Sequence, residues 1–473
     1  MFSIGTFRSQ SRMKNYFLLI IRPVILGLCC AIFAIGINGC AYFSNSATPS
    51  FQKSNLAQLE SSERQIRVSG KSRGLTAGIA KNEITPPWGT PLAGFGKRKG
   101  KPSIGVLDPL WAHTLVVSDG EDTVAFVSLD LMAVHEKLRD EVLQNISAKA
   151  GIGPEDLFLM ASHTHSGSGG LTDRWTYELV SGKYNRLIFK KTAAAIAHAI
   201  NEAFLNQVPV KWGAGKRPIS NFNQNRMIEN GPVDSQLTVI RIDGPQDKPL
   251  ALLTNFSAHP TILGSSNFKF SADFPGHLAQ TVEKKFPGAL CLFSNSASAD
   301  IKPSTHERPT DYEESVEYGE RLGVEVIATA ENIKTENVNE IVSVGTALKL
   351  PPVKLRWGWL SLPGWLGNRF FSRETYINAA RIGNVLFLSV PGEMSTALGL
   401  NIKNKMEADG FVPVIAGYTN DYIAYILTRD EYKLDEYEAS VSFYGPRLGE
   451  FITELLLKEG SMIKRSGKMS IEK

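Results

Sequence analysis

The stretch LFLMASHTHSGSGG, residues 157–170, decides how we interpret both the fold and the chemistry of this chain. It begins as an apolar run typical of a buried strand, passes through His163 and His165, and ends in a loop of Ser and Gly. Residues two apart in an extended segment point to the same side, so both imidazoles can reach one point. A Gly-rich turn lets the backbone bend closely around a bound group. The pair either belongs to a metal or catalytic site, or it is simply two hydrogen-bonded histidines that close a strand. Which of the two applies depends on whether other parts of the chain supply further ligands or catalytic groups.

Outward from this stretch, apolar segments of strand length alternate with segments of helical spacing. A hairpin is expected over 115–130, where Asp119-Gly120 marks the turn. Further strands are expected at 157–162, 208–213, 237–242, 252–257, 290–293, 341–350, 376–382, 385–390 and 411–416. Helices are expected at 135–150, 187–204, 274–286, 312–333, after Pro391, and at 446–457. This alternation predicts an α/β fold with a mixed, twisted β-sheet core flanked by helices, in a single large catalytic domain spanning 74–473.

The N-terminus has the pattern of a secretory signal. Basic residues precede an uncharged run, 24–37, and the sequence Ile37-Asn38-Gly39-Cys40 then resembles a lipoprotein processing site. The run is short for spanning ~30 Å of hydrocarbon, although an uncleaved membrane anchor is the alternative. We therefore expect a lipoprotein-type signal peptide at 1–39 and a lipid anchor at Cys40. The body of the protein would then be exported and membrane-anchored, on the periplasmic or outer-membrane side of a bacterial cell.

Composition restricts the remaining possibilities. Residues 40–73 are rich in Ser, Asn, Gln and charge without periodicity, which predicts a flexible tether after the lipidated Cys. Of the four Cys, only Cys291 lies in the expected domain, so neither an internal disulfide nor a Cys-based metal site is expected there. The net charge is +4 over 473 residues, with no basic stripe interleaved with aromatics, which argues against nucleic acid as a partner.

Five of the expected strands end in polar side chains. They lead in turn to His163 and His165, to His259, to Asp300, to Glu393, and to a Tyr-rich segment, 418–425. Ligands of open α/β sheets bind beyond the carboxyl ends of the strands, so mutually parallel strands would bring these groups into one crevice. Two or three His with a carboxylate and a Tyr form the donor set of a catalytic zinc site, in which zinc acidifies a bound water and polarises a carbonyl. Singly, each group also has a structural interpretation, such as Glu393 at a helix N-terminus.

Other enzyme classes lack their signatures here. The chain has no G-x-S-x-G elbow, no Walker loop and no H-E-x-x-H helix, and Gly94-Phe95-Gly96 is not followed by a further Gly at the dinucleotide-binding spacing.

At these residues the chain resembles the N-terminal catalytic domain of the neutral/alkaline, non-lysosomal ceramidases. The resembling segments, in family order from about Leu75 to Leu457, are AGIAKNEITPP, DPLWAHTLVV, SHTHSGSGG, NQNR with VDSQLTVIRI, NFSAHPTIL, SADFPG, PGEMST, and NDYIAYILTRDEYKLDEYEA with FYGP. The resemblance implies one zinc ion and hydrolysis of the amide of ceramide. It implies His163, His259, Glu393 and Tyr425 as the zinc ligands. It also implies His165 as the group that stabilises the oxyanion, with Arg226 and Tyr437 lining the pocket.

Three departures from the family pattern stand out. The family's D-V-S-P loop supplies a catalytic Ser, and Lys302 stands at that position here, in ADIKP. The chain ends soon after FYGP, so we expect the C-terminal β-sandwich of full ceramidases to be missing. The segment RWGWLSLPGWLGNRFF, 356–371, does not align; its aromatic residues form either a membrane-facing lip or a loop over the protein's own core. These aromatics are Trp357, Trp359, Trp365, Phe370 and Phe371.

Two functions follow. The first is a zinc-dependent hydrolase that cleaves a lipid-like amide, of ceramide or another N-acyl substrate, with zinc-activated water. The alternative is a catalytically weak lipid- or envelope-binding lipoprotein that retains a structural zinc. In both, the partners are a lipid or N-acyl small molecule and a membrane.

Overall fold

The computed structural model describes residues 48–63, 74–353 and 370–469. The expected signal peptide (1–39), Cys40 and most of the Trp-rich segment therefore lie outside the described residues. Within them, no helix is both long enough and apolar enough to cross a membrane.

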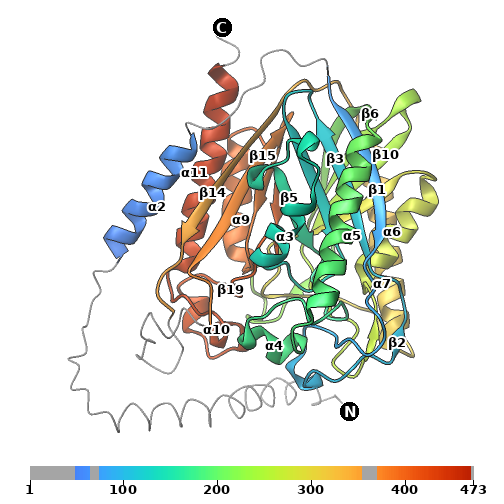
Figure 1. Ribbon diagram of the computed structural model, residues 1–473, viewed down its shortest axis with the longest axis vertical. Helices are drawn as coiled ribbons and strands as arrows, with labels where there is room; N and C mark the ends of the chain where they lie inside the picture. Colours follow the sequence, from blue (N-terminus) through green and yellow to red (C-terminus); the bar gives the residue numbers. More distant parts are fainter. Residues whose placement is uncertain (1–47, 64–73, 354–369, 470–473) are drawn as a thin grey trace.

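Three mixed sheets form the framework of the fold (Figure 1). The first has the order β5-β4-β3-β1-β6, with bounds Leu157–Ala161, Thr123–Leu129, Trp111–Ser118, Thr76–Glu83 and Val208–Pro209. The second has the order β12-β10-β9-β7, with bounds Leu290–Asn295, Pro249–Phe256, Gln236–Asp243 and Lys211–Pro218. The third has the order β14-β15-β16-β18, with bounds Ile341–Lys349, Glu374–Ile382, Val385–Ser389 and Val412–Ala416. The α/β class and the mixed sheets are confirmed; the division into three sheets was not visible in the sequence.

Each sheet contains one parallel pair: β4 with β5, β10 with β12, and β16 with β18. Backbone hydrogen bonds join the ends of these strands, from Ser296 to Phe256, from Gly417 to Asn295, and from Ala161 to Tyr418. The five strand ends that carry polar residues therefore meet at one place, as the sequence analysis expected. Four short strands complete this end of the molecule, β8 and β13 (Asn223–Asn225, Ile301–Pro303) and β17 and β19 (Glu393–Met394, Tyr425–Ile426).

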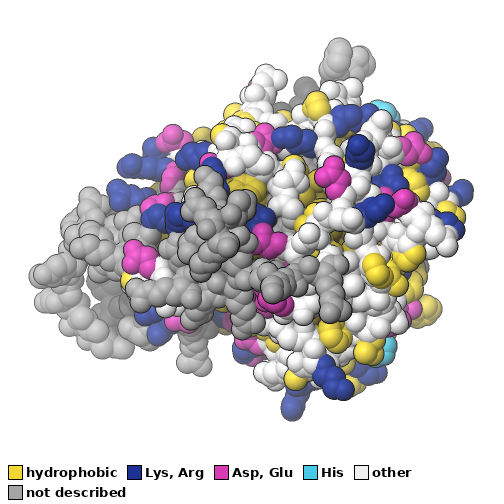
Figure 2. All heavy atoms as spheres, turned by 90° about the horizontal axis from the view of Figure 1, so that it is seen from above, with side chains coloured by type: hydrophobic (Ala, Val, Ile, Leu, Met, Phe, Trp, Pro, Cys, Tyr) yellow, Lys and Arg dark blue, Asp and Glu magenta, His cyan; other side chains and the backbone are white. Residues whose placement is uncertain are grey.

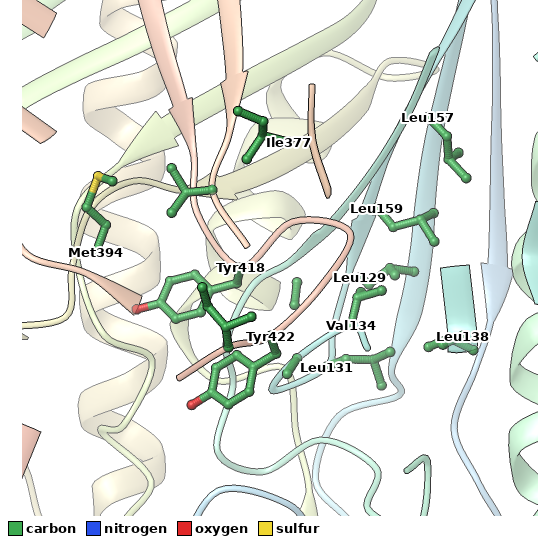
Figure 3. Packing of buried hydrophobic residues seen from close by; sticks show 14 of the residues in the cluster. Leu129, Leu131, Val134, Leu138, Leu157, Leu159, Ile377, Met394, Tyr418 and Tyr422 are labelled. Carbon is green, nitrogen blue, oxygen red and sulfur yellow. The ribbon is translucent and has the colours of Figure 1, made fainter. Parts of the chain in front are cut away.

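The core lies where the three sheets face one another. One face of each sheet contributes to a common apolar cluster, in which the rings of Phe126, Phe158 and Phe387 lie with centroids 4.4–6.3 Å apart. Because side chains alternate along a strand, the other face of each sheet is also apolar and is covered by helices. Figure 3 shows this second layer, where Leu129 and Leu159 lie in the same cluster as Tyr418 and Tyr422 near the strand ends.

The helices cover the outer faces of the sheets (Figure 1). α3 (Glu136–Asn145) and α5 (Arg186–Leu205) cover the first sheet, α6 (Phe274–Lys285) and α7 (Asp311–Ala330) the second, and α9 (Thr396–Ala408) and α11 (Leu448–Met469) the third. Two shorter helices, α4 (Trp175–Ser181) and α10 (Tyr437–Ser440), lie at the end that holds the strand termini. Seen from the opposite end, Lys and Arg are interspersed with Asp and Glu (Figure 2).

One expectation about the N-terminal segment is wrong. Residues expected to form an irregular tether contain a helix, α2 (Thr48–Glu63), that packs against β14 and α11. The side chain of Asn55 is fully buried and pairs with the backbone of Lys349, donating to its carbonyl at 3.1 Å and accepting from its N–H at 3.0 Å. α2 has few apolar residues, and it packs through the Asn55 amide and Leu59. Its sequence therefore shows no apolar periodicity from which a helix could be predicted.

Two aromatic residues of the expected lip are described. Phe371 is buried, with its ring 4.3 Å from that of Phe443, so it belongs to the core and not to a lip. Phe370 is half-buried and packs edge-on against Trp175 of α4.

Candidate metal centre

The backbone after β5 places the first two histidines. Ser162 and His163 donate their N–H groups to Leu129 and Leu131, so the chain continues beside the end of β4. At His163 the backbone then turns with φ of 72°, in the left-handed region that a non-Gly residue rarely adopts. The Nε2 atoms of His163 and His165 lie 3.1 Å apart. The two rings thus reach one point as expected, but through a turn at His163 and not through the extended geometry that the sequence suggested.

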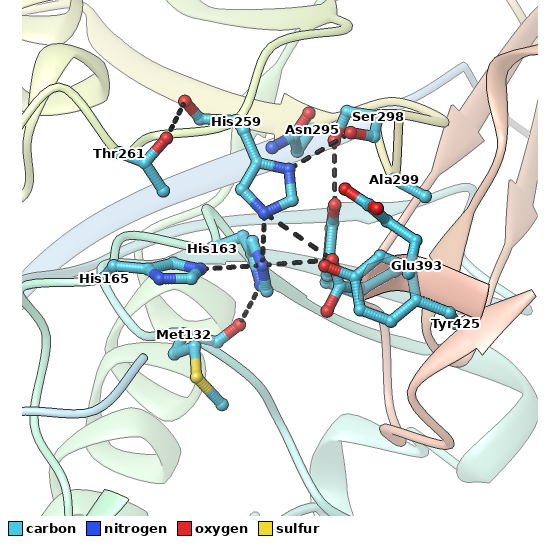
Figure 4. A network of polar contacts seen from close by, with 12 residues as sticks. Met132, His163, His165, His259, Thr261, Asn295, Ser298, Ala299, Glu393 and Tyr425 are labelled. Carbon is cyan, nitrogen blue, oxygen red and sulfur yellow. Dashed lines mark hydrogen bonds and ion pairs between the residues drawn. The ribbon is translucent and has the colours of Figure 1, made fainter. Parts of the chain in front are cut away.

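His259, beyond the end of β10, completes a cluster of three imidazoles (Figure 4). Its Nε2 lies 3.0 Å from that of His163. The opposite nitrogens of these two rings are each held by a backbone carbonyl: Nδ1 of His163 donates to Met132 at 2.6 Å, and Nδ1 of His259 donates to Ser298 at 3.1 Å. With the proton on Nδ1, each Nε2 presents a lone pair to the same point.

Glu393, beyond the end of β16, brings a carboxylate to this point. Its Oε2 lies 3.5 Å from Nε2 of both His163 and His259 and has no hydrogen-bond donor among the described residues. Its other oxygen, Oε1, accepts a hydrogen bond from the hydroxyl of Tyr422. Burial alone would raise the pKa of Glu393, but His163 and Tyr422 outweigh it and hold the pKa below its usual value. The carboxylate is therefore ionised.

These residues fit a bound metal ion. His163 and Glu393 are 1% and 2% exposed, and Nε2 of His163, Nε2 of His259 and Oε2 of Glu393 point at one another in this buried place. Burial, with the positive charge of Arg226, holds the pKa of His259 well below its usual value, so that this ring does not become cationic to relieve the repulsion. A divalent cation satisfies all three atoms at once, and nitrogen and oxygen donors without thiolate suit zinc.

Tyr425 lies beside Glu393, because β17 and β19 pair in parallel with these two residues in register. Its hydroxyl accepts a hydrogen bond from Arg226 at 3.1 Å. Arg226 also donates to the carbonyl of Ala299 at 2.6 Å, and its Nε lies 3.0 Å from Glu438. Although burial acts to lower the pKa of Arg226, Tyr425 and Glu438 raise it above its usual value, so the guanidinium stays charged. The half-buried Tyr437 packs edge-on to Tyr425, with ring centroids 6.1 Å apart.

His165 differs from the other two histidines. Its Nδ1 is buried without a hydrogen-bond partner in the described chain, so no carbonyl fixes its tautomer. Burial, with the neighbouring His163 and Arg98, holds the pKa of His165 well below its usual value and keeps the ring neutral. Arg98 donates to the backbone carbonyl of His165, and the ring of Phe95 lies edge-on to its imidazole at 4.7 Å. His165 is thus positioned through its backbone and ring face, while its Nε2 lies 3.1 Å from that of His163 and no carbonyl holds its Nδ1 in the described chain.

The pattern of a known family covers this site. The family described as "Neutral/alkaline non-lysosomal ceramidase, N-terminal" matches residues 75–316 and 367–452. The chain belongs to this family. The match includes every residue placed in the cluster above.

Ceramidases of several organisms are related to the chain over much of its length. The neutral ceramidase of Pseudomonas aeruginosa is 23% identical over 78% of this chain and 69% of its own length. The neutral ceramidase of Mycobacterium tuberculosis is 21% identical over 75% of this chain and 71% of its own length. The chain thus spans about two thirds of these relatives. A crystal structure of the Pseudomonas enzyme has a TM-score of 0.72 at 21% identity, covering 83% of this chain and 75% of that one, and shows the same fold.

The fold brings together the seven residues predicted as metal ligands or catalytic groups, which are His163, His165, Arg226, His259, Glu393, Tyr425 and Tyr437. Lys302, at the position of the family serine, lies in β13, where its side chain is exposed and it pairs with Gln224 of β8, two residues before Arg226.

Sequence reasoning assigned no role to several neighbours. Tyr418 stacks on the ring of His163, with centroids 4.0 Å apart and planes 22° apart, and its hydroxyl lies 2.8 Å from the Ser298 hydroxyl. Tyr418 and Tyr422 stood in the recognised Tyr-rich segment, but nothing in their spacing separated them from Tyr425. Glu438 stood in the quoted segment NDYIAYILTRDEYKLDEYEA but was given no role, and Arg98 carried no signal because its contacts join segments distant in sequence.

Proposed function

We propose that this ceramidase family member hydrolyses the amide bond of ceramide or of a related N-acyl lipid at a zinc centre. The observation that carries the proposal is the convergence of two anchored imidazoles and one unpartnered carboxylate oxygen in a buried site. His163, His259 and Glu393 would hold the metal, and Tyr425 would complete the set. When bound, zinc supplies an acidified water and polarises the carbonyl of the substrate.

The remaining residues bind the substrate and handle charge. His165 is neutral and not committed to a carbonyl, so it can carry its proton on Nε2 and donate it in a hydrogen bond to the oxygen that becomes negative. The fixed positive charge of Arg226, held by Glu438 and Ala299, orients the Tyr425 hydroxyl toward the cluster. Tyr437 packs beside Tyr425 and would line the same pocket.

The test separates metal binding from turnover in the full-length protein. Mass spectrometry of the wild type should show about one zinc per chain, and N-acyl lipids should be hydrolysed. His163→Ala and His259→Ala should lose both zinc and turnover. His165→Ala should keep the zinc and lose turnover. His198→Ala, in an exposed part of α5, is the control and should change neither.

The second candidate is a lipid-binding protein with a structural zinc. It predicts zinc binding without turnover of any acyl substrate, and His165→Ala would then have no measurable consequence. Turnover that survives His163→Ala with zinc absent would contradict both candidates.

We also propose that the protein is exported and anchored through a lipid on Cys40, on the basis of the N-terminal pattern alone. Labelling with a radioactive fatty acid should mark the wild type and not Cys40→Ser. Equal labelling of the two would exclude the anchor.

A further inference from the structure

A long excursion of the chain, 86–106, forms part of the end that holds the strand termini. Its two arms pair at the base, where Gly89 donates to Ser103, Ser103 donates to Thr90, and Pro91 bridges to Pro102. The tip folds into a short 3₁₀ helix, η1 (Gly96–Arg98), that contacts α4. Beyond the base, β2 (Gly105–Val106) pairs in parallel with β11 (Lys269–Phe270). Figure 1 shows α4, β2 and β19 at this same end of the molecule.

The outer side of this excursion is apolar where its arms meet. Trp88 is 74% exposed and Ile104 is 67% exposed, and each lies one residue from the hydrogen-bonded pair Gly89 and Ser103. Val106, in β2, is also exposed. Large apolar side chains grouped on a surface mark an interaction site, whereas single ones are common.

The tip is strongly basic. Lys97, Lys99 and Lys101 are all exposed, and none forms an ion pair with any residue that the structure describes. The single acidic residue between Ile84 and Leu110 is Asp108, which is buried and bound to the hydroxyls of Ser271 and Tyr312. The opposite end of the molecule, in contrast, mixes both signs of charge (Figure 2).

The inner side of the same excursion touches the site. Gly94 lies so close to His165 that a Cβ built on it would come within 2.5 Å of the imidazole Cγ, and Arg98 donates to the His165 carbonyl. One loop therefore contacts His165 through Gly94 and Arg98 and also carries exposed lysine, tryptophan and isoleucine side chains.

From this juxtaposition we infer that Trp88, Ile104, Lys97, Lys99 and Lys101 form a docking face for a bilayer that contains anionic phospholipid. Trp is favoured at the membrane interface, Ile inserts into the acyl region, and lysines near an anionic surface are attracted to it. The exposed aliphatic side chain of Ile104, beside the hydrogen-bonded pair at the base of the excursion, favours lipid over nucleic acid, which stacks on aromatic groups instead. The inference rests on the proposed function in that the docked loop would bring a membrane-resident substrate to His165.

The test uses the full-length protein reconstituted in vesicles and measures docking independently of catalysis. Brominated phosphatidylcholine quenches Trp emission only where the indole enters the bilayer. The chain has 7 Trp, so Trp88→Phe isolates the contribution of Trp88. In vesicles of phosphatidylcholine and phosphatidylglycerol, the bromolipid should quench more of the Trp emission of the wild type than of Trp88→Phe. This difference should become smaller in vesicles of phosphatidylcholine alone.

Charge reversal of the three tip lysines is the second test, and it has a matched control. The triple variant Lys97→Glu, Lys99→Glu, Lys101→Glu should lower the ratio of docked to undocked protein about tenfold or more. The control carries the same charge change at three exposed lysines that precede β5, β10 and β12 in the chain, which are Lys149, Lys248 and Lys284, the last in the final turn of α6. These lysines precede the strands whose far ends hold the site, so the control should dock as the wild type does. Circular dichroism checks that all variants are folded.

The outcomes are separable. Equal quenching of wild type and Trp88→Phe, or equal losses in the two triple variants, would overturn the docking face. Docking without hydrolysis of any N-acyl lipid would overturn the proposed function and leave the docking face intact. Hydrolysis without quenching of Trp88 would overturn the docking face and leave the proposed function intact.

Discussion

The contact between Gly94 and His165 gives the sharpest test of the role assigned to His165. Gly94 has a φ of 106°, and a Cβ at this position would lie 2.5 Å from Cγ and 2.7 Å from Nδ1 of the imidazole. Ordinary van der Waals contact begins near 3.4 Å, so the ring in Gly94→Ala must move by about 0.9 Å, the difference between 3.4 and 2.5 Å. Displacing a catalytic group by ~1 Å can cost about 100-fold in rate. We therefore expect kcat/KM for an N-acyl lipid to fall about 100-fold.

Gly89→Ala is the matched control for this substitution. Gly89 lies in the same excursion with a φ of 89°, but a Cβ there would meet no atom within 4 Å. Both variants carry the same backbone strain of about 1 kcal/mol, which thermal unfolding should register in each. Zinc content should be unchanged in both, because neither glycine touches His163 or His259. If Gly94→Ala turns over substrate as fast as Gly89→Ala, then His165 does not act in the reaction and the assignment is wrong.

Three further predictions address the metal, the interior and the altered loop. Tyr422→Phe removes the hydrogen bond to Glu393 and should weaken zinc affinity about 10- to 100-fold in a chelator competition, whereas Tyr444→Phe, which loses a buried hydroxyl bonded to Ser372, should not. Burial raises the pKa of Glu459 from its ordinary value of 4.5 to about 8, so the folded state retains a proton that the unfolded chain releases. The free energy of unfolding should therefore decrease as pH rises from about 4.5 to about 8, and Glu459→Gln should flatten this dependence in denaturant titrations; an unchanged slope would show that Glu459 is ionised in the folded protein. Lys302→Ser should leave zinc content and turnover of the preferred N-acyl substrate unchanged within about threefold, because the Lys302 side chain is exposed and substitutions of exposed side chains usually have small effects; a large gain on ceramide would show that this position sets the substrate.

The local order of the fold was accessible from the sequence, because it depends on short-range patterns. Alternating apolar segments located nearly all long strands and helices, and the polar groups at strand ends identified the residues that meet at the site. Parallel neighbours end at the same edge, which accounts for β10 with β12 and for β16 with β18, whereas the meeting of these two pairs with β5 depends on how the three sheets pack. The hairpin of β3 and β4 was predicted for the same reason, because Asp119-Gly120 is a local turn signal.

Long-range pairing was not accessible. The grouping of strands into three sheets depends on contacts between segments far apart in the chain, such as the packing of Phe126 against Phe387. The contact of Arg98 with the His165 carbonyl depends in the same way on where the excursion folds back. The left-handed backbone at His163 was missed because a histidine gives no sign of an unusual φ. The resemblance implied different roles for the histidines, but the difference in their hydrogen bonding is visible only in the folded chain, where Nδ1 of His163 and of His259 donates to a carbonyl.

The helix α2 has a consequence for how this protein can be handled. β14 is the outermost strand of its sheet, and Asn55 occupies the N–H and C=O of Lys349 on its open side. An uncovered edge strand offers its backbone to the strands of other molecules and promotes aggregation. A fragment that begins near residue 74 would keep the metal residues but lose this cover. α2, which the sequence patterns did not reveal, thus covers the edge of β14 and opposes self-association. Soluble fragments for crystallisation should therefore begin before Thr48.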